Sequence, residues 1–157
     1  MEKKRINWKI LICSFLVVYA VAFFGSLFTS PSINSGWYDT IKPSITPPNW
    51  IFPVVWNILF FLIAVSLYLV ISNKNKRNNK KALTFFGINL ALNLLWSVLF
   101  FGLRNPPLAF FELILFWISI LTLILTSYKV NKTSAYLLVP YLLWVTFAGV
   151  LNYLSAF

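Results

Sequence analysis

Long apolar stretches alternate with short polar connections along the whole chain. Five stretches are long enough, at about 1.5 Å of rise per residue, to cross roughly 30 Å of hydrocarbon as helices. They are Ile10–Phe28, Trp50–Ser72, Ala82–Leu103, Pro107–Tyr128 and Ser134–Phe157. The connections hold turn residues at 29–36, a basic run at 73–81 and Arg-Asn-Pro-Pro at 104–107. The pattern predicts an all-α membrane protein, a five-transmembrane-helix bundle that forms a single domain over residues 1–157.

The start of the chain allows a second interpretation. A basic stretch, an apolar run and Ala20-Val-Ala22 resemble a secretory signal with its cleavage site. The apolar run continues to Phe28, however, which is longer than the usual core of a signal. We therefore interpret this run as the first helix, with cleavage after residue 22 as the alternative.

Composition agrees with a membrane location and removes several function classes. Hydrophobic residues make up 60% of the chain, far above the average for soluble proteins. The chain has no His and one Cys, Cys13, so it offers no imidazole acid or base, no zinc cluster and no disulfide framework. A Ser-His-Asp triad is excluded, no conventional catalytic motif remains, and we expect neither a metal nor a cofactor.

The net charge of +10 is concentrated on one side of the five predicted spans. Eleven of the thirteen Lys and Arg residues precede span one or lie between spans two and three or four and five, whereas the other side has Lys42 and Arg104. The positive-inside rule then predicts a cytoplasmic N-terminus and a C-terminus outside, and the strength of the bias favours a bacterial cell membrane. Because these charges lie in short loops beside helix ends, we expect no nucleic-acid partner.

Polar and small residues divide span three into two faces. Asn89, Asn93 and Trp96 share one face, and the opposite face carries Gly87-x-x-x-Ala91, a spacing that lets two helices approach closely. Such a contact forms either within one chain or between the two chains of a dimer. The amides have a purely structural explanation as well, because polar side chains bond across helices in membranes.

Glu112 is the strongest candidate for a functional residue inside a span, since acids are rare there. The topology places Trp56, Asn57 and Asn152 at a similar depth, with Asn93 and Trp144 nearer the middle of the membrane. We predict an aromatic-walled pocket that opens toward the outer side, under an ordered lid formed by residues 29–49. For Trp37, an interfacial aromatic belt remains the alternative to a lid.

Three segments, 37–56, 89–101 and 140–152, carry a further pattern. Their distinctive residues are Trp37, Tyr38, Lys42, Pro43, Pro47, Pro48, Trp50, Phe52, Trp56, Asn93, Trp96, Phe100, Phe101, Pro140, Tyr141, Trp144, Phe147, Ala148 and Asn152. Together with the five spans, they resemble the translocator protein family, also called TspO or tryptophan-rich sensory proteins, over nearly the whole chain.

This resemblance implies a bundle that binds porphyrins and related tetrapyrroles such as protoporphyrin IX and haem, often as a homodimer in the lipid bilayer. Family members also bind isoquinolines and benzodiazepines, and mitochondrial members bind cholesterol. The positions that match the family's ligand pocket are Tyr38, Pro43, Trp56, Asn93, Glu112, Trp144, Phe147 and Ala148. Dimer contacts through span three would involve Gly87 and Ala91.

Two departures from the family pattern bear on the ligand. Ile45 stands where the family often has Trp, and no basic residue follows Tyr153 to complete the pattern proposed for cholesterol binding. Three functions remain open: a porphyrin-binding sensor or regulator of tetrapyrrole levels, an enzyme that degrades protoporphyrin in light and oxygen, and a transporter of porphyrins or other small hydrophobic molecules. Trp56 and Trp144 would be the redox residues of such an enzyme. The transporter is weakened as a hypothesis, because the five spans show no internal repeat and no pair of broken helices.

Overall fold

The computed structural model describes residues 6–73 and 76–157. Within them the chain forms α-helices and one π-helical segment. Their bounds are α1 Trp8–Asn34, α2 Trp37–Ile41, α3 Ile51–Ile71, α4 Lys76–Ser97, η1 Val98–Gly102, α5 Pro106–Tyr128, α6 Lys132–Leu137 and α7 Val139–Ala156. Five units are long and apolar enough to cross a membrane: α1, α3, α4 with η1, α5, and α6 with α7. The predicted five-span helical fold is confirmed.

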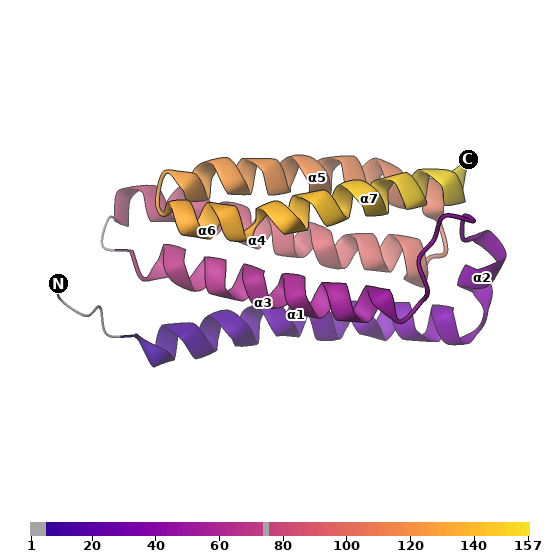
Figure 1. Cartoon of the computed structure of the whole chain (residues 1–157), viewed down its shortest axis with the longest axis horizontal. Coiled ribbons are helices and arrows are strands. Elements are labelled where there is room, and N and C mark those ends of the chain that lie inside the picture. The colour runs from indigo at the N-terminus through magenta and orange to yellow at the C-terminus, as the bar shows by residue number, and fades with distance from the viewer. Residues whose placement is uncertain (1–5, 74–75) are drawn as a thin grey trace.

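The five units lie side by side along one long axis (Figure 1). The short helix α2 and the C-terminus lie at one end of the bundle, which we call the α2 end, and α1 begins at the other (Figure 1). The most extensive helix pairs are α4 with α5, α5 with α7 and α1 with α3. Large apolar side chains cover the outside, for example Leu16, Phe111 and Leu143, each at least 61% exposed. Such a surface suits hydrocarbon rather than water.

The first helix is longer than the sequence pattern predicts. A turn was expected at residues 29–36, but α1 continues through Pro31 and ends at Asn34. Hydroxyl groups support this segment, because Thr29 donates to the Gly25 carbonyl at 3.1 Å and Ser32 donates to the Phe101 carbonyl at 2.6 Å. Gly36, with φ +74°, then turns the chain into α2. The connection to α3 is therefore residues 35–50, shorter than the predicted lid.

The α2-end half of α1 packs against α4 and η1 rather than against α3. A Cβ atom added at Gly102 would lie 2.9 Å from Phe28 Cδ1, and one added at Gly25 would lie 3.4 Å from Ser97 Oγ. Side-chain contacts between α1 and α3 occur nearer the opposite end, where the Tyr19 hydroxyl donates to the Asn57 carbonyl at 3.4 Å. The hydrogen bonds and ring contacts between α1 and α3 therefore lie between Asn57 and the end of the bundle where α1 begins.

Two spans contain irregular turns that the apolar pattern does not reveal. Span three ends in the π segment, where the Leu103 amide donates to the Val98 carbonyl at 2.7 Å. Phe100 and Phe101 fall in this segment and are both buried. Span five is interrupted at Leu138, two residues before Pro140, which lacks the amide proton that a continuous helix would use. π turns of this kind frequently accompany functional sites.

Candidate functional site

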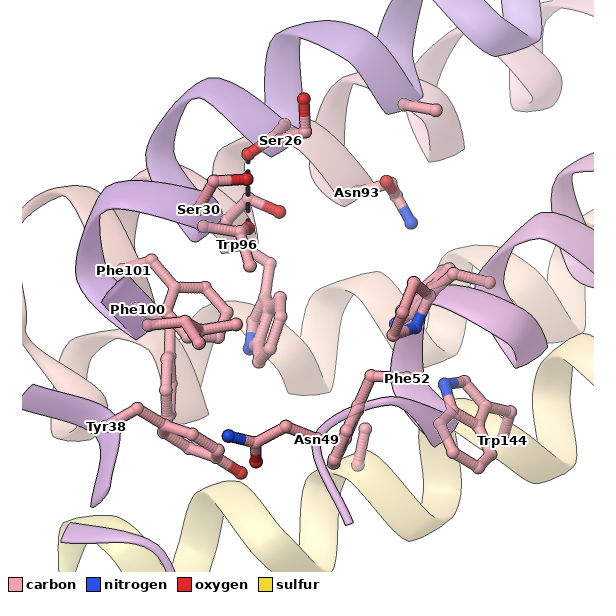
Figure 2. Close-up of a pocket in the computed structure, with 18 of the residues that line it drawn as sticks. Ser26, Ser30, Tyr38, Asn49, Phe52, Asn93, Trp96, Phe100, Phe101 and Trp144 are labelled. Carbon is pink, nitrogen blue, oxygen red and sulfur yellow. Dashed lines mark hydrogen bonds between the residues drawn. The ribbon is translucent and has the colours of Figure 1, made fainter. Parts of the chain in front are cut away.

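A cavity of about 550 Å³ lies within the α2-end half of the bundle. Residues of α1, α3, α4, η1 and α7 line it, and Tyr38 of α2 and Asn49 close its end (Figure 2). The lining residues are Val21, Ala22, Gly25, Ser26, Thr29, Ser30, Ile33, Tyr38, Asn49, Trp50, Phe52, Pro53, Trp56, Asn57, Phe60, Asn93, Trp96, Ser97, Phe100, Phe101, Trp144, Ala148, Leu151, Asn152 and Ser155.

Aromatic rings form the walls of the cavity. Trp56 stacks on Phe60 with ring centroids 5.4 Å apart, and Trp96 stacks on Phe100 at 5.1 Å. Trp144 meets Phe52 edge-on at 5.8 Å. Each indole is thus fixed by a neighbouring ring, so the cavity presents rigid flat surfaces. Such surfaces favour a planar, apolar ligand.

A buried chain of polar side chains runs from the cavity into the bundle. The Asn93 amide nitrogen donates to the Tyr141 hydroxyl at 3.3 Å, and this hydroxyl donates to Asn89 Oδ1 at 3.1 Å. The Asn89 amide nitrogen donates in turn to Ser119 Oγ at 2.8 Å. All four residues are buried, and together they connect α4, α5 and α7. With its nitrogen held by Tyr141, Asn93 keeps its carbonyl oxygen as an acceptor at the cavity wall.

A second polar contact fixes the Trp96 indole. Trp96 Nε1 donates to Asn152 Oδ1 at 3.0 Å, and the Asn152 amide nitrogen donates to the Pro106 carbonyl at 2.8 Å. Asn152 is 1% exposed, so both of its polar atoms are satisfied away from water. The contact ties α7 to the wall on α4 and to the start of α5.

The helix α2 closes the end of the cavity. Tyr38 is buried, with its ring 5.8 Å from that of Phe101, and the Trp37 ring lies 5.9 Å from that of Phe100. The Arg104 guanidinium lies 5.7 Å from the centre of the Trp37 ring and also donates to Ser35 Oγ at 3.2 Å. Trp37 is therefore held by these contacts beside Tyr38, which lines the closed end of the cavity.

Burial raises the pKa of the Tyr38 hydroxyl above its ordinary value of 10.0, and the neighbouring Asp39 carboxylate adds to the rise. The unfolded chain loses this proton near pH 10 while the folded protein retains it, so stability falls as the pH rises above about 10. We expect a smaller alkaline decline in thermal stability for Tyr38→Phe than for the parent protein. Equal declines in melting scans from pH 8 to 11 would show that Tyr38 is not the group responsible.

Five of the eight predicted ligand-binding residues line the cavity: Tyr38, Trp56, Asn93, Trp144 and Ala148. The other three, Pro43, Glu112 and Phe147, do not. Phe147 lies one layer behind the wall, with its ring 5.7 Å from that of Trp144. Pro43 is half-buried in the connection between α2 and α3.

Glu112 lies behind the cavity rather than in it. It is 7% exposed on α5, and neither carboxylate oxygen has a hydrogen-bond partner within the described residues. Helix α5 packs on α4 and α7, and these two helices separate it from the cavity. The periodicity of span four indicates that Glu112 faces inward, but inward for α5 means toward α4 and α7.

The contribution of α1 to the site was missed. Seven lining residues come from this helix: Val21, Ala22, Gly25, Ser26, Thr29, Ser30 and Ile33. A signal existed, because small and hydroxyl residues recur at positions 22, 26 and 30 and at positions 25 and 29, which is helical spacing. The prediction of a turn from residue 29 interrupted that pattern.

Gly87 and Ala91 lie on the exposed side of α4. Within the described residues, no atom of a neighbouring helix lies within 4 Å of a Cβ added at Gly87, so α4 makes no close contact with another described helix at this position. The sequence allowed a contact of this face either within one chain or between the two chains of a dimer. At Gly87 the described residues form no close contact within the chain.

The fold and the cavity define a five-span helical membrane protein with an aromatic cavity inside the bundle. The sequence profile of the TspO/MBR family matches residues 14–156, and the chain belongs to this family.

The chain is similar to proteins from all three domains of life. It is 41% identical to the tryptophan-rich protein TspO of Archaeoglobus fulgidus over 143 residues, 91% of this chain and 92% of that one. It is 43% identical to the protein of the same description from Chlorobaculum tepidum, covering 85% of each chain. It is 34% identical to the human translocator protein, covering 74% of this chain and 71% of that one.

Proposed function

We propose that this multi-pass membrane protein binds tetrapyrroles, such as protoporphyrin IX and haem, in the aromatic cavity. The observation that carries the proposal is the meeting of four indoles around one cavity with the Asn93 amide at its wall; they are Trp50, Trp56, Trp96 and Trp144. A tetrapyrrole is flat and rigid, and stacking on such rings contributes about 1 kcal/mol per good contact beyond burial. The cavity volume of about 550 Å³ is that of a typical ligand site.

The protein acts, in this proposal, as a sensor or regulator of tetrapyrrole levels. A relative from Cereibacter sphaeroides carries the description tryptophan-rich sensory protein, which supports a signalling role over a purely structural one. We place the N-terminus in the cytoplasm and the α2 end outside a bacterial cell membrane, because the positive charges gather on the N-terminal side. We also propose a homodimer through the exposed face that carries Gly87 and Ala91, where small residues permit close helix contact.

Ring recognition should depend little on iron. The chain has no His to bind the iron of haem, and within residues 6–73 and 76–157 no three His, Cys, Asp or Glu side chains gather to hold a metal ion. We expect dissociation constants for protoporphyrin IX and haem within about tenfold, or 1.4 kcal/mol, of each other.

The experiment is a tryptophan-quenching titration in lipid nanodiscs with both ligands. Trp117→Phe is the control, because Trp117 lies on α5 outside the cavity. A haem preference of about a thousandfold would contradict recognition of the ring alone, and absence of saturable quenching would overturn the proposed function.

A second candidate function uses the same cavity. Trp56 and Trp144 both line it, and Trp144 Nε1 is buried with no hydrogen-bond partner within the described residues. Photo-oxidation of bound protoporphyrin in light and oxygen would use these indoles. Illumination of the loaded protein distinguishes the candidates: a new bilin-like absorbance that Trp144→Phe abolishes supports the enzyme, whereas slow bleaching unaffected by the substitution supports the binding protein.

A further inference from the structure

The cavity has a mouth in the side of the bundle. Most lining residues are buried or half-buried, but five are both lining and exposed. They are Ser26, Ser30, Trp50, Pro53 and Asn57. Two belong to the α2-end half of α1, two belong to the start of α3 and Trp50 directly precedes α3, whereas every lining residue of α4, η1 and α7 is buried or half-buried. The mouth therefore lies between α1 and α3.

The packing of α1 explains why the mouth is there. The close approach of Phe28 to Gly102, and the bond from Ser32 to the Phe101 carbonyl, draw the α2-end half of α1 onto η1. Contacts between α1 and α3 lie farther from the α2 end, where the Phe15 and Phe61 rings meet at 5.4 Å and Tyr19 reaches the Asn57 carbonyl. Asn57 thus takes part in the contact with α1 and also forms the near edge of the mouth.

The α2 end itself is closed over the cavity. Tyr38 is 7% exposed and packs edge-on against Phe52, Phe100 and Phe101 at centroid distances of 6.5, 6.1 and 5.8 Å. Arg104 holds Trp37 and Ser35 in place beside it. A ligand that arrived from the aqueous side at this end would have to displace these contacts, whereas the side mouth requires no such displacement.

The rim of the mouth is polar although its surroundings are apolar. Ser26, Ser30 and Asn57 stand beside outward-facing residues such as Leu27 and Ile58, which are 52% and 55% exposed. Ser26 Oγ donates to the Phe23 carbonyl at 2.7 Å and the Asn57 amide nitrogen donates to the Pro53 carbonyl at 2.8 Å, so both donors are satisfied within their own helices. Their oxygens can still accept a hydrogen bond from a polar substituent of a flat ligand while its apolar body remains in hydrocarbon.

The geometry points to a lateral portal: planar amphiphilic ligands reach the cavity from the bilayer leaflet at the α2 end, between α1 and α3, rather than through the lid. This inference rests on the proposed function, because it concerns the same cavity and names tetrapyrroles dissolved in lipid as the ligand that passes. It assigns a role in ligand access to Ser26, Ser30 and Asn57.

Narrowing the portal tests this route through binding kinetics. In nanodiscs, the double variant Ser26→Phe, Ser30→Phe should slow both association and dissociation of protoporphyrin IX by fivefold or more. Both rates fall because an obstructed path raises the barrier to passage in either direction. Cys13→Phe is the matched control, a small-to-large change on the exposed surface of α1 away from the mouth.

The rival route gives the opposite pattern. If ligands pass the lid, Arg104→Ala should accelerate association because it removes the contacts with Trp37 and Ser35, and the double variant should match the Cys13→Phe control. That result would overturn the portal while leaving tetrapyrrole binding intact. Unchanged association in Arg104→Ala together with slow rates in the double variant supports the portal.

A second measurement does not depend on tetrapyrroles. A fatty acid with a photoreactive group at its tail, dissolved in the bilayer, should label Leu151 and Asn152, which line the cavity and are buried from the outer surface. Labelling at these positions, relative to the lipid-facing Leu143, should fall at least threefold in the double variant. If Leu151 and Asn152 are not labelled in the parent protein, the portal is overturned, whether or not a porphyrin binds.

Discussion

Replacing Trp56 and Trp144 together by alanine is expected to lower the affinity for protoporphyrin IX by about 100-fold, or 2.7 kcal/mol. Each indole contributes about 1 kcal/mol of stacking and adds apolar area that the ligand buries. The loss should exceed that of either single variant, because the two rings line one cavity from α3 and α7. The measurement is a titration in nanodiscs followed by the absorbance of the bound porphyrin, which does not depend on the number of tryptophans.

Trp117→Ala provides the control for this experiment. Trp117 is an indole on α5 that donates to Thr146 Oγ1 at 2.8 Å and does not line the cavity, so its removal should leave affinity within about threefold of the parent protein. Equal losses in this variant and in the double variant would mean that the substitutions act through the general integrity of the bundle. Retention of parent affinity in the double variant would place the ligand elsewhere.

Tyr141→Phe is expected to destabilise the protein by about 1 to 3 kcal/mol and to weaken ligand binding as well. The hydroxyl accepts a hydrogen bond from Asn93 and donates one to Asn89, at 0% exposure, so its removal leaves two buried amide atoms without partners. Releasing Asn93 also frees its side chain to turn at the cavity wall. Unfolding in mixed micelles measures the first effect, and the nanodisc titration measures the second.

The two effects of Tyr141→Phe are separable. Tyr153→Phe removes an exposed tyrosine hydroxyl near the other end of α7 and should change neither quantity. A loss of stability with unchanged affinity would mean that Asn93 does not orient the ligand. Unchanged stability would mean that the buried chain of polar groups contributes little to the fold.

The helical bundle could be predicted because hydrocarbon imposes one requirement on every span, a run of about twenty apolar residues. Asn93, Trp56 and Trp144 line the cavity, and the sequence indicates their direction because polar and aromatic residues at helical spacing mark the side of a helix that faces its neighbours. What it could not supply was the identity of those neighbours. Glu112 faces inward, yet α4 and α7 stand between α5 and the cavity.

The prediction of a turn at residues 29–36 rested on local residue preferences, but tertiary contacts determine the conformation of this segment. The residue types at 29–32 are typical of a turn. The Ser32 hydroxyl, however, donates a hydrogen bond to the Phe101 carbonyl, and α1 continues to Asn34. The π segment at 98–102 is equally invisible in the apolar pattern, because a single wider turn hardly alters the hydropathy of a span. Both features lie where α1 meets η1, and both shape the site.

An opening toward the hydrocarbon also has a practical consequence for anyone who purifies the protein. Surfactant tails are apolar and slender, and in a micelle they surround the gap between α1 and α3 at high local concentration. They would compete with any bound molecule for the indole-lined space, so apparent affinities should vary with the alkyl length of the surfactant and should be highest when native-like phospholipid replaces it.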